Sequence, residues 1–150
     1  MEYLRGGTIL RINLTDSKVA REPTSLYTGK FLGGRGINSA ILYQGVGPAV
    51  NPYDPENMLI FGVGPLAGTL FPGACRTDVL AKSPVTLAIG NASLGGYWGA
   101  ELKFAGYDHL VIQGKAAGPV YLSIYNDEVE VRKADKAWGQ DCCETPKIIR

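Results

Sequence analysis

Cysteine is scarce in this chain, and its placement excludes the common cysteine-based sites. The three cysteines are Cys75, Cys142 and Cys143, and no Cys-x-x-Cys pair occurs. Without that pair the sequence has no readable zinc or iron–sulfur site, and we interpret the adjacent cysteines as structural. An odd number of cysteines without regular spacing argues against a disulfide framework, so we expect a reducing compartment, the cytoplasm.

Long apolar runs and an excess of one charge are also missing. No segment approaches the ~20 apolar residues of a membrane-spanning helix. The first five residues, Met1 to Arg5, carry an acid and no apolar stretch, which is not the pattern of a signal peptide. The net charge of +1 gives no electrostatic reason to expect nucleic acid or an anionic membrane as a partner.

Histidine occurs once, which excludes sites built from several histidines. His109 follows Asp108, and no serine or cysteine forms a readable catalytic triad with it. We therefore predict that His109 is a partly buried strand residue. Glu101 is open to two interpretations, an acceptor behind a ligand site or a solvated side chain.

Glycine is abundant, with 20 residues beside 9 prolines. Glycine permits tight turns and a close approach of the backbone to a ligand, so we expect many turns around one core. A length of 150 residues suits one domain. Hydrophobic residues make up 45% and charged residues 19% of the chain, which is typical of globular proteins.

The apolar pattern predicts a sheet-rich α+β fold with short helices. Two hairpins are expected over 8–21 and 120–132, where apolar and polar residues alternate beside short polar turns. Trp98, Leu102 and Ala105 fall on one helical face. The remaining elements are helices over 37–44 and 97–105, strands over 58–61, 76–82, 87–89 and 109–113, and a last helix from Glu144.

A weak internal repeat divides the chain into two similar halves. The two hairpins resemble each other, and the pairs Gly33-Gly34 and Gly95-Gly96 each precede a predicted helix. Two such halves would form a platform of two pseudo-two-fold related β-sheets, with a glycine turn from each facing a shared ligand. Chance similarity between common strand and turn patterns explains the repeat equally well.

The stretch from Gly95 to Asp108 is central to the sequence. Its glycine pair leads into a helix, and the free N–H groups of such a turn can bind an anion such as phosphate. An ordinary loop-to-helix junction explains the same residues, and local features alone favour it. Gly106 stands where a left-handed residue is expected to end the helix.

Two other motifs are open to competing interpretations. Gly62-x-Gly64-x-x-x-Gly68 follows a predicted strand, but its spacing does not fit a dinucleotide-binding motif, so we interpret it as a turn lining a pocket. Arg76 lies beside a glycine-rich turn and can hold an anion through its planar guanidinium. A surface ion pair between Arg76 and Asp78 is the simpler alternative.

These motifs together resemble the N-terminal domain of the tungsten-containing aldehyde ferredoxin oxidoreductases. The stretch from Gly95 to Asp108, GGYWGAELKFAGYD, is similar to the signature of that family. Further motifs occur in the family's order: RINLT at 11–15, LGGRG at 32–36, PEN-x-LI at 55–60, GPL-x-GT at 64–69, KSP at 82–84, GKA at 114–116 and PVY at 119–121. Because the ordered motifs span essentially all 150 residues, the resemblance is more specific than any one motif.

The resemblance implies a fold and a cofactor. In the family, two sheets related by a pseudo-two-fold axis each support one molybdopterin; the pterin dithiolenes hold one tungsten, and a magnesium ion bridges the pterin phosphates. The resemblance places Arg76 between a pterin and an iron–sulfur cluster, and the backbone of Gly95 beside a pterin phosphate. The magnesium contact falls on the main-chain carbonyl of Ser93, where the family usually has asparagine, or on that of Asn91 instead.

The resemblance also implies an activity. Family members oxidise aldehydes to carboxylates with water and pass two electrons through a [4Fe–4S] cluster to ferredoxin. The cluster cysteines and acid–base residues of the family lie beyond position 150, and the cysteines of this chain do not replace them. We expect residues 1–150 to be the tungstopterin-binding domain of a longer oxidoreductase chain, inactive by itself and without catalytic residues. The alternatives are a free-standing pterin-binding protein and a subunit that completes a partner.

Overall fold

A computed structural model describes residues 4–149, and within them the chain forms a sheet-rich α+β fold. The strands are β1 (Thr8–Asn13), β2 (Lys18–Pro23), β3 (Met58–Val63), β4 (Thr77–Lys82), β5 (Ile89–Leu94), β6 (Tyr107–Gln113), β7 (Val120–Tyr125) and β8 (Glu128–Lys133). The helices are α1 (Ser25–Thr28), α2 (Gly34–Gly45), α3 (Trp98–Phe104) and α4 (Thr145–Ile149).

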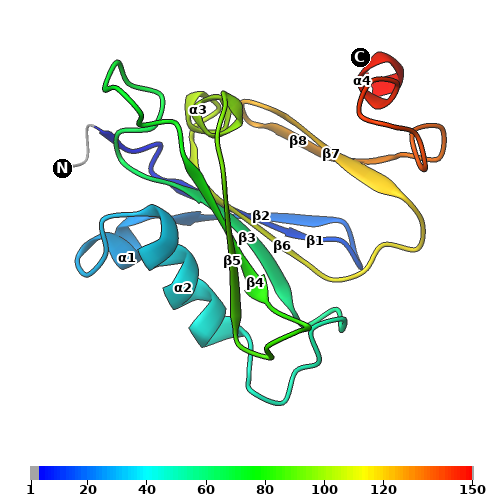
Figure 1. The fold of residues 1–150 in the computed structure, drawn as a ribbon, viewed down its shortest axis with the longest axis horizontal. Helices are drawn as coiled ribbons and strands as arrows, with labels where there is room; N and C mark the ends of the chain where they lie inside the picture. Colours follow the sequence, from blue (N-terminus) through cyan, green and yellow to red (C-terminus); the bar gives the residue numbers. More distant parts are fainter. Residues whose placement is uncertain (1–3, 150) are drawn as a thin grey trace.

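Six strands form one mixed sheet in the order β2-β1-β6-β3-β4-β5 (Figure 1). Neighbouring strands are antiparallel except β1 and β6, which run parallel. A parallel pair requires a long crossover, and residues 14–106 supply it. The other two strands, β7 and β8, pair as a separate antiparallel hairpin.

Helix α2 covers one face of the six-stranded sheet, across β3 and β4. Ile37 and Ile41 lie one turn apart on its buried side and pack with Ile60, Leu80 and Val111 of the sheet. Residues at i and i+4 share one stripe of a helix, so the apolar spacing fixes the side that faces the strands.

The β7–β8 hairpin and α3 lie on the opposite face of the sheet (Figure 1). Leu122 and Val131 of the hairpin pack against a buried cluster that includes Leu10 and Leu110 of the sheet and Leu102 of α3. The chain thus has two apolar layers, one on each side of the six-stranded sheet. This arrangement leaves β5 at the edge of the sheet.

The predicted fold class is confirmed. Two sheets with short helices are present, and both expected hairpins and both expected inner helices form, as β1–β2, β7–β8, α2 and α3. Gly106 has φ of 94°, as expected for a left-handed residue that ends α3. Since the two sheets have six and two strands within residues 4–149, the pseudo-two-fold relation between them stays a prediction.

The four single strands predicted from the sequence have wrong boundaries: β3 and β6 each extend two residues beyond the prediction. β4 begins at Thr77, so Arg76 precedes the strand. The strand expected over 87–89 is β5, from Ile89 to Leu94, and Leu87 has φ of 57° in the turn before it. Most residues of β5 are small or polar and have low strand propensity, so its pairing with β4, and not local preference, fixes this strand.

Candidate functional site

Four segments of the chain meet at one end of the six-stranded sheet. Val63 pairs with Thr77 and Thr77 with Leu94, so the end of β3, the start of β4 and the end of β5 lie in one row. The turn before α2 joins them, because a Cβ placed on Gly33 would lie 3.2 Å from the Val63 carbonyl oxygen. We call this region the glycine end, formed by Gly33 to Arg35, Gly64 and Pro65, Arg76, and Ser93 to Gly96.

Three glycines of the glycine end have open space beside the backbone. A Cβ added to Gly64, Gly95 or Gly96 would meet no heavy atom within 4 Å. Gly96 also has φ of 89°, a conformation that other residues rarely adopt. Backbone N–H groups in such a turn are donors for an anion, and the missing side chains leave room for a large ligand to approach them.

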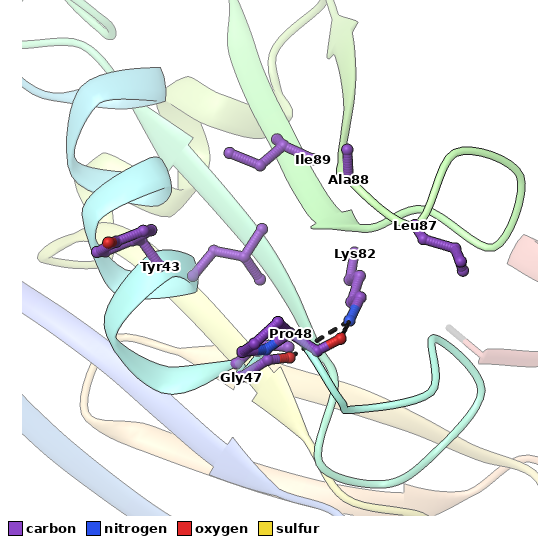
Figure 2. Close-up of a pocket in the computed structure, with 9 residues that line it drawn as sticks. Tyr43, Gly47, Pro48, Lys82, Leu87, Ala88 and Ile89 are labelled. Atoms are coloured by element: carbon purple, nitrogen blue, oxygen red, sulfur yellow. Dashed lines mark hydrogen bonds between the residues drawn. The ribbon is translucent and has the colours of Figure 1, made fainter.

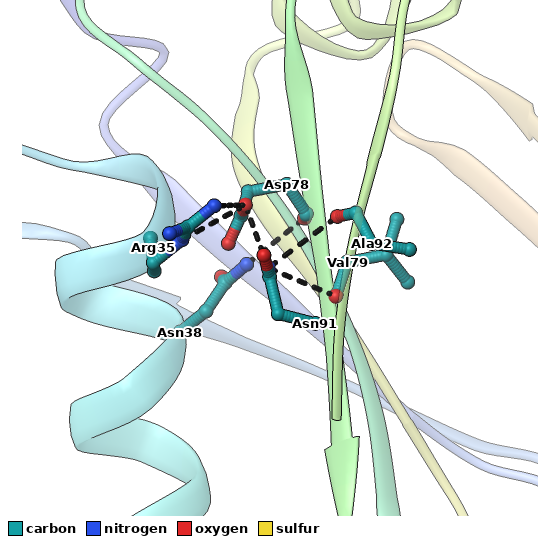
Figure 3. Close-up of polar contacts among 6 residues, drawn as sticks. All are labelled: Arg35, Asn38, Asp78, Val79, Asn91 and Ala92. Atoms are coloured by element: carbon teal, nitrogen blue, oxygen red, sulfur yellow. Dashed lines mark hydrogen bonds and ion pairs between the residues drawn. The ribbon is translucent and has the colours of Figure 1, made fainter. Parts of the chain in front are cut away.

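Arg76 is exposed and immediately precedes Thr77, the partner of Leu94, so it lies beside Gly95. The alternative ion pair between Arg76 and Asp78 does not form. Asp78 Oδ1 instead accepts hydrogen bonds from Nε and Nη2 of Arg35, at 3.3 and 3.2 Å (Figure 3). Within residues 4–149 the Arg76 guanidinium has no hydrogen-bond or ion-pair partner, so its donors are available to a ligand.

Ser93 and Asn91 lie on the exposed edge strand β5, opposite Asp78 and Leu80 of β4. The side-chain amide of Asn91 donates to Asp78 Oδ1 at 2.8 Å (Figure 3). Among the described strands β5 pairs with β4 alone, so part of its backbone faces away from the sheet. Outward carbonyl oxygens of this kind are suitable ligands for a hard cation.

Lys103 of α3 is hydrogen-bonded to the Gly64–Pro65 loop. Its ammonium donates to the carbonyl oxygens of Gly64 and Pro65 at 2.9 and 3.0 Å, and lies 3.5 Å from Asp108 Oδ1. Burial lowers the pKa of Lys103, while the charge of Asp108 acts against that shift. The loop at the end of β3 is therefore fixed by hydrogen bonds from a buried lysine.

A second buried polar group lies behind the start of β4. His109 and Asn38 are both fully buried, and His109 Nδ1 lies 2.7 Å from Asn38 Oδ1. Burial lowers the pKa of His109 to about 4, so the ring is neutral near pH 7. A Cβ on Gly62 would collide with both side chains, which explains why a glycine stands there. The motif from 62 to 68 is thus partly a packing requirement, and the sheet is not the parallel one of dinucleotide-binding folds.

A pocket lies away from the glycine end, between the end of α2 and the turn before β5 (Figure 2). It has a volume of about 460 Å³ and a mostly apolar lining. Its one charged residue is Lys82, which donates to the carbonyl oxygens of Gly47 and Pro48 at 3.3 and 2.8 Å. Because the ammonium already holds this loop in place, Lys82 has a structural role.

The structure brings together the residues that the sequence singled out. Arg76, Ser93 and Gly95 belong to the glycine end, Asn91 lies two residues before it on β5, and Glu101 is exposed on α3. The three cysteines are free and exposed rather than packed. His109 is fully buried and not partly buried as expected. No group of three or more histidine, cysteine, aspartate or glutamate side chains in the described part of the chain is placed to hold a metal.

Sequence reasoning did not identify Asn38 and Lys103 as supports of the site. Their partners are 71 residues away in the case of His109 and 39 residues away in the case of Gly64. The one available signal was a polar residue on the apolar stripe of α2, since Asn38 lies three and four residues before Ile41 and Leu42. Residues 4–149 also contain no helix that is long and apolar enough to cross a bilayer.

The sheet end is thus open, lined by glycines and flanked by Arg76, which has no side-chain partner among residues 4–149. The family model of the aldehyde ferredoxin oxidoreductase N-terminal domain matches residues 9–150, and the chain belongs to this family.

Curated relatives agree with this assignment. The tungsten-containing aldehyde ferredoxin oxidoreductase of Pyrococcus abyssi is 48% identical over 145 residues, which is 96% of this chain and 24% of the relative. The protein of the same name from Pyrococcus furiosus is 45% identical over 99% of this chain and 25% of its own length. The chain thus spans about a quarter of the length of these relatives.

A solved structure has the same fold. The active site complex BamBC of benzoyl coenzyme A reductase, in complex with 1,5-dienoyl-CoA, matches with a TM-score of 0.93 at 42% identity. The match covers 97% of this chain and 22% of the other. At this level of similarity the fold of the domain is shared, while most of the other protein lies outside the matched part.

Proposed function

We propose that residues 1–150 are the tungstopterin-binding domain of an aldehyde ferredoxin oxidoreductase in the cytoplasm. The observation that carries the proposal is the glycine end, where an unpaired Arg76 lies beside the open backbone of Gly95. Relatives 48% and 45% identical are named as tungsten-containing, so the expected ligand is tungsten held by two molybdopterins. Three free cysteines agree with a reducing compartment.

The residues present fit this cofactor. The backbone at Gly95 has the open space that a pterin phosphate needs to reach N–H donors. Arg76 suits a place between a pterin and a [4Fe–4S] cluster, because its planar guanidinium donates in more than one direction. The main-chain carbonyl of Ser93, or of Asn91 instead, suits the magnesium ion, which prefers oxygen ligands.

The bound metal centre supplies the two-electron oxidation of an aldehyde and water to a carboxylate, with the electrons leaving through a [4Fe–4S] cluster to ferredoxin. Residues 1–150 bind and orient the cofactor, and Arg76 donates hydrogen bonds to its anionic groups. The cluster ligands and acid–base residues belong to the remainder of the oxidoreductase chain. We expect the 150-residue chain alone to lack tungsten and iron and to reduce no viologen dye with aldehydes; near-stoichiometric iron by elemental analysis contradicts this.

A second candidate is a tungsten enzyme that acts on a different substrate. Identity to the benzoyl coenzyme A reductase complex is 42%, close to the identities with the aldehyde oxidoreductases. A relative of 40% identity from Pyrococcus furiosus is named an aliphatic sulfonate oxidoreductase, WOR-like subunit. The domain is therefore compatible with several substrates. Comparing the rates at which the full-length chain turns over aldehydes and aromatic thioesters separates the two candidates.

Substitution of Arg76 in the full-length enzyme tests the proposed site. Arg76→Ala removes hydrogen bonds to two anionic partners, each of which contributes about 1.5–3 kcal/mol. We therefore expect electron transfer to the cluster to slow or the cluster potential to shift. Arg76→Lys keeps the charge but loses the planar fork, so it falls between wild type and alanine. Both variants are compared by aldehyde-dependent ferredoxin reduction and by redox titration of the cluster.

The control is Arg132→Ala, since Arg132 is an exposed arginine of β8 that pairs with Glu130 at 2.6 Å. It should leave rates, potential and tungsten content at wild-type values, because surface pairs contribute about 0–1 kcal/mol. Wild-type rates and an unchanged potential in Arg76→Ala, with tungsten intact, assign Arg76 to the surface and overturn its proposed role.

A further inference from the structure

One aspartate connects three of the segments that form the glycine end. Asp78 lies in β4, two residues after Arg76, and pairs across the sheet with Ser93. Its Oδ1 accepts hydrogen bonds from Arg35 of α2 at 3.2 Å and from Asn91 of β5 at 2.8 Å (Figure 3). The carboxylate therefore joins the start of α2 and the middle of β5 to β4.

The backbone of Asp78 is held from the buried side. Its carbonyl oxygen accepts a hydrogen bond from Asn38 Nδ2 at 3.0 Å. Since a carbonyl only accepts, the amide nitrogen of Asn38 faces Asp78 and its Oδ1 faces His109 Nδ1, 2.7 Å away. That ring nitrogen must carry the proton, and Nε2 is then a buried acceptor without a donor among the described residues.

The side chains of Asn38 and His109 are confined by the atoms packed around them. Asn38 and His109 have no exposed surface, and both lie against the backbone at Gly62. The hydrogen bonds run from β6 through α2 to β4, so a change at His109 reaches the strand that begins beside Arg76. Arg76 has no partner of its own in residues 4–149, so its location depends on where β4 begins.

We propose that Asp78, Asn38 and His109 form a positioning unit that sets Arg76 and Ser93 at the cofactor. The proposal rests on the proposed function, because Arg76 and Ser93 are the candidate cofactor residues there. None of the three touches the cofactor in this proposal. Supports behind ligand residues commonly change affinity about 10–100-fold when they are substituted, so the unit should be measurable through cofactor loading.

A pair of histidine variants in the full-length oxidoreductase chain provides the test. The amide nitrogen of asparagine takes about the place of Nδ1, whereas that of glutamine reaches toward Nε2. We expect tungsten bound per chain, measured by mass spectrometry of the metal, to fall about 10-fold in His109→Gln and in Asn38→Asp. His109→Asn should retain most of it, and hydrogen exchange over 76–80 and 90–95 should quicken only in the first two variants.

The control is Ile41→Ala, because Ile41 is a buried α2 residue against the same sheet with no polar contact to Asp78. It should lose stability by leaving a cavity but keep its tungsten. Equal tungsten loss in Ile41→Ala, or unchanged exchange in His109→Gln and Asn38→Asp, overturns the positioning unit. Wild-type protein without tungsten overturns the proposed function instead, and the exchange measurement still tests the unit.

Asp78→Asn provides a second route if His109→Gln does not fold. This change removes the charge that holds Arg35 and leaves the buried contact between Asn38 and His109 in place. We expect faster exchange over 90–95 and lower tungsten content in this variant. Wild-type values for both measurements overturn the role of Asp78.

Discussion

Gly33-Gly34 leads into α2 and Gly95-Gly96 leads into α3, but the surroundings of the two turns differ. A Cβ on Gly33 would lie 3.2 Å from the Val63 carbonyl oxygen, so that turn packs against the end of β3. A Cβ on Gly95 or Gly96 would meet nothing within 4 Å. The first turn is needed for packing, whereas the second leaves space at the surface beside the residues that we propose to bind the cofactor.

Gly62 and Gly64 repeat this contrast within one strand end. A Cβ on Gly62 would collide with Asn38 and His109, while a Cβ on Gly64 has open space around it. A glycine that is required by its packed neighbours and a glycine with open space beside it therefore stand two residues apart. The contrast leads to four predictions, which compare the stability of packed positions with that of open ones and end on cofactor loading at an open position.

The largest expected effect concerns the buried imidazole ring of His109, which packs against Gly62. His109 titrates with a pKa of about 4 in the folded chain and near its ordinary 6.5 when unfolded. Between pH 6.5 and 4 the unfolded chain binds more protons at His109 than the folded chain does, so the free energy of unfolding falls as the pH falls. Above pH 6.5 the contribution of His109 to this free energy is constant. The loss is about 3 kcal/mol, from 1.36 kcal/mol per unit of pKa difference.

Denaturant unfolding of the 150-residue chain between pH 7 and 4 measures this loss. Burial is the main cause of the lowered pKa, Asp108 opposes it, and Arg5 and Lys103 add to it. The carboxylates titrate in the same range, so the informative quantity is the difference between wild type and His109→Asn. Parallel curves for the two proteins would show that His109 is not held neutral.

Gly62→Ala should have the next largest effect. The added methyl would meet Asn38 and His109, neither of which can move without breaking its buried hydrogen bond. Overpacking of this kind costs about 1–3 kcal/mol, and the upper end is expected here. Gly64→Ala in the same 150-residue chain is the matched control and should unfold like wild type; similar midpoints for both variants contradict the packing argument.

Gly96→Ala should cost less, because only the backbone opposes it. The φ of 89° is unfavourable for any side chain, yet no neighbouring atom lies within 4 Å of the new methyl. The expected loss is about 1–2 kcal/mol, the cost of a left-handed conformation. Gly96→Asn tests the cause, since asparagine tolerates this region better and should recover part of the loss; equal stability of both variants with wild type would mean that the turn relaxes.

Much of the fold could be predicted from local pattern. Alternation predicted both hairpins, the i, i+4 spacing predicted α3, and an apolar stretch after a glycine turn predicted α2. β5 was misplaced because Gly90 to Ser93 have no strand preference of their own and depend on pairing with β4. The pattern also could not indicate that β1 and β6 run parallel, since that depends on the path of residues 14–106.

The site was only partly accessible from the sequence. Arg76, Ser93 and Gly95 came from a resemblance in ordered motifs, and in the structure Arg76 directly precedes β4 while Ser93 and Gly95 lie at the end of the neighbouring strand β5. The partners of Asp78 could not be predicted, because Arg35 lies 43 residues away in the chain and no local rule links the two. Long-range polar contacts of this kind depend on how the elements pack, so the simplest local guess paired Asp78 with Arg76 instead.

Gly95→Ala should change stability least and separates packing from binding most clearly. Gly95 has no neighbour within 4 Å of a new Cβ and no left-handed φ, so the unfolding free energy of the 150-residue chain should stay within about 0.5 kcal/mol of wild type. In the full-length enzyme the methyl would take space beside the N–H groups that we assign to a pterin phosphate, so tungsten content should fall. Gly118→Ala is the matched control, since Gly118 is equally open but lies in the loop between β6 and β7. Full tungsten in Gly95→Ala, measured beside that control, would mean that the open space at this turn is not where the cofactor lies.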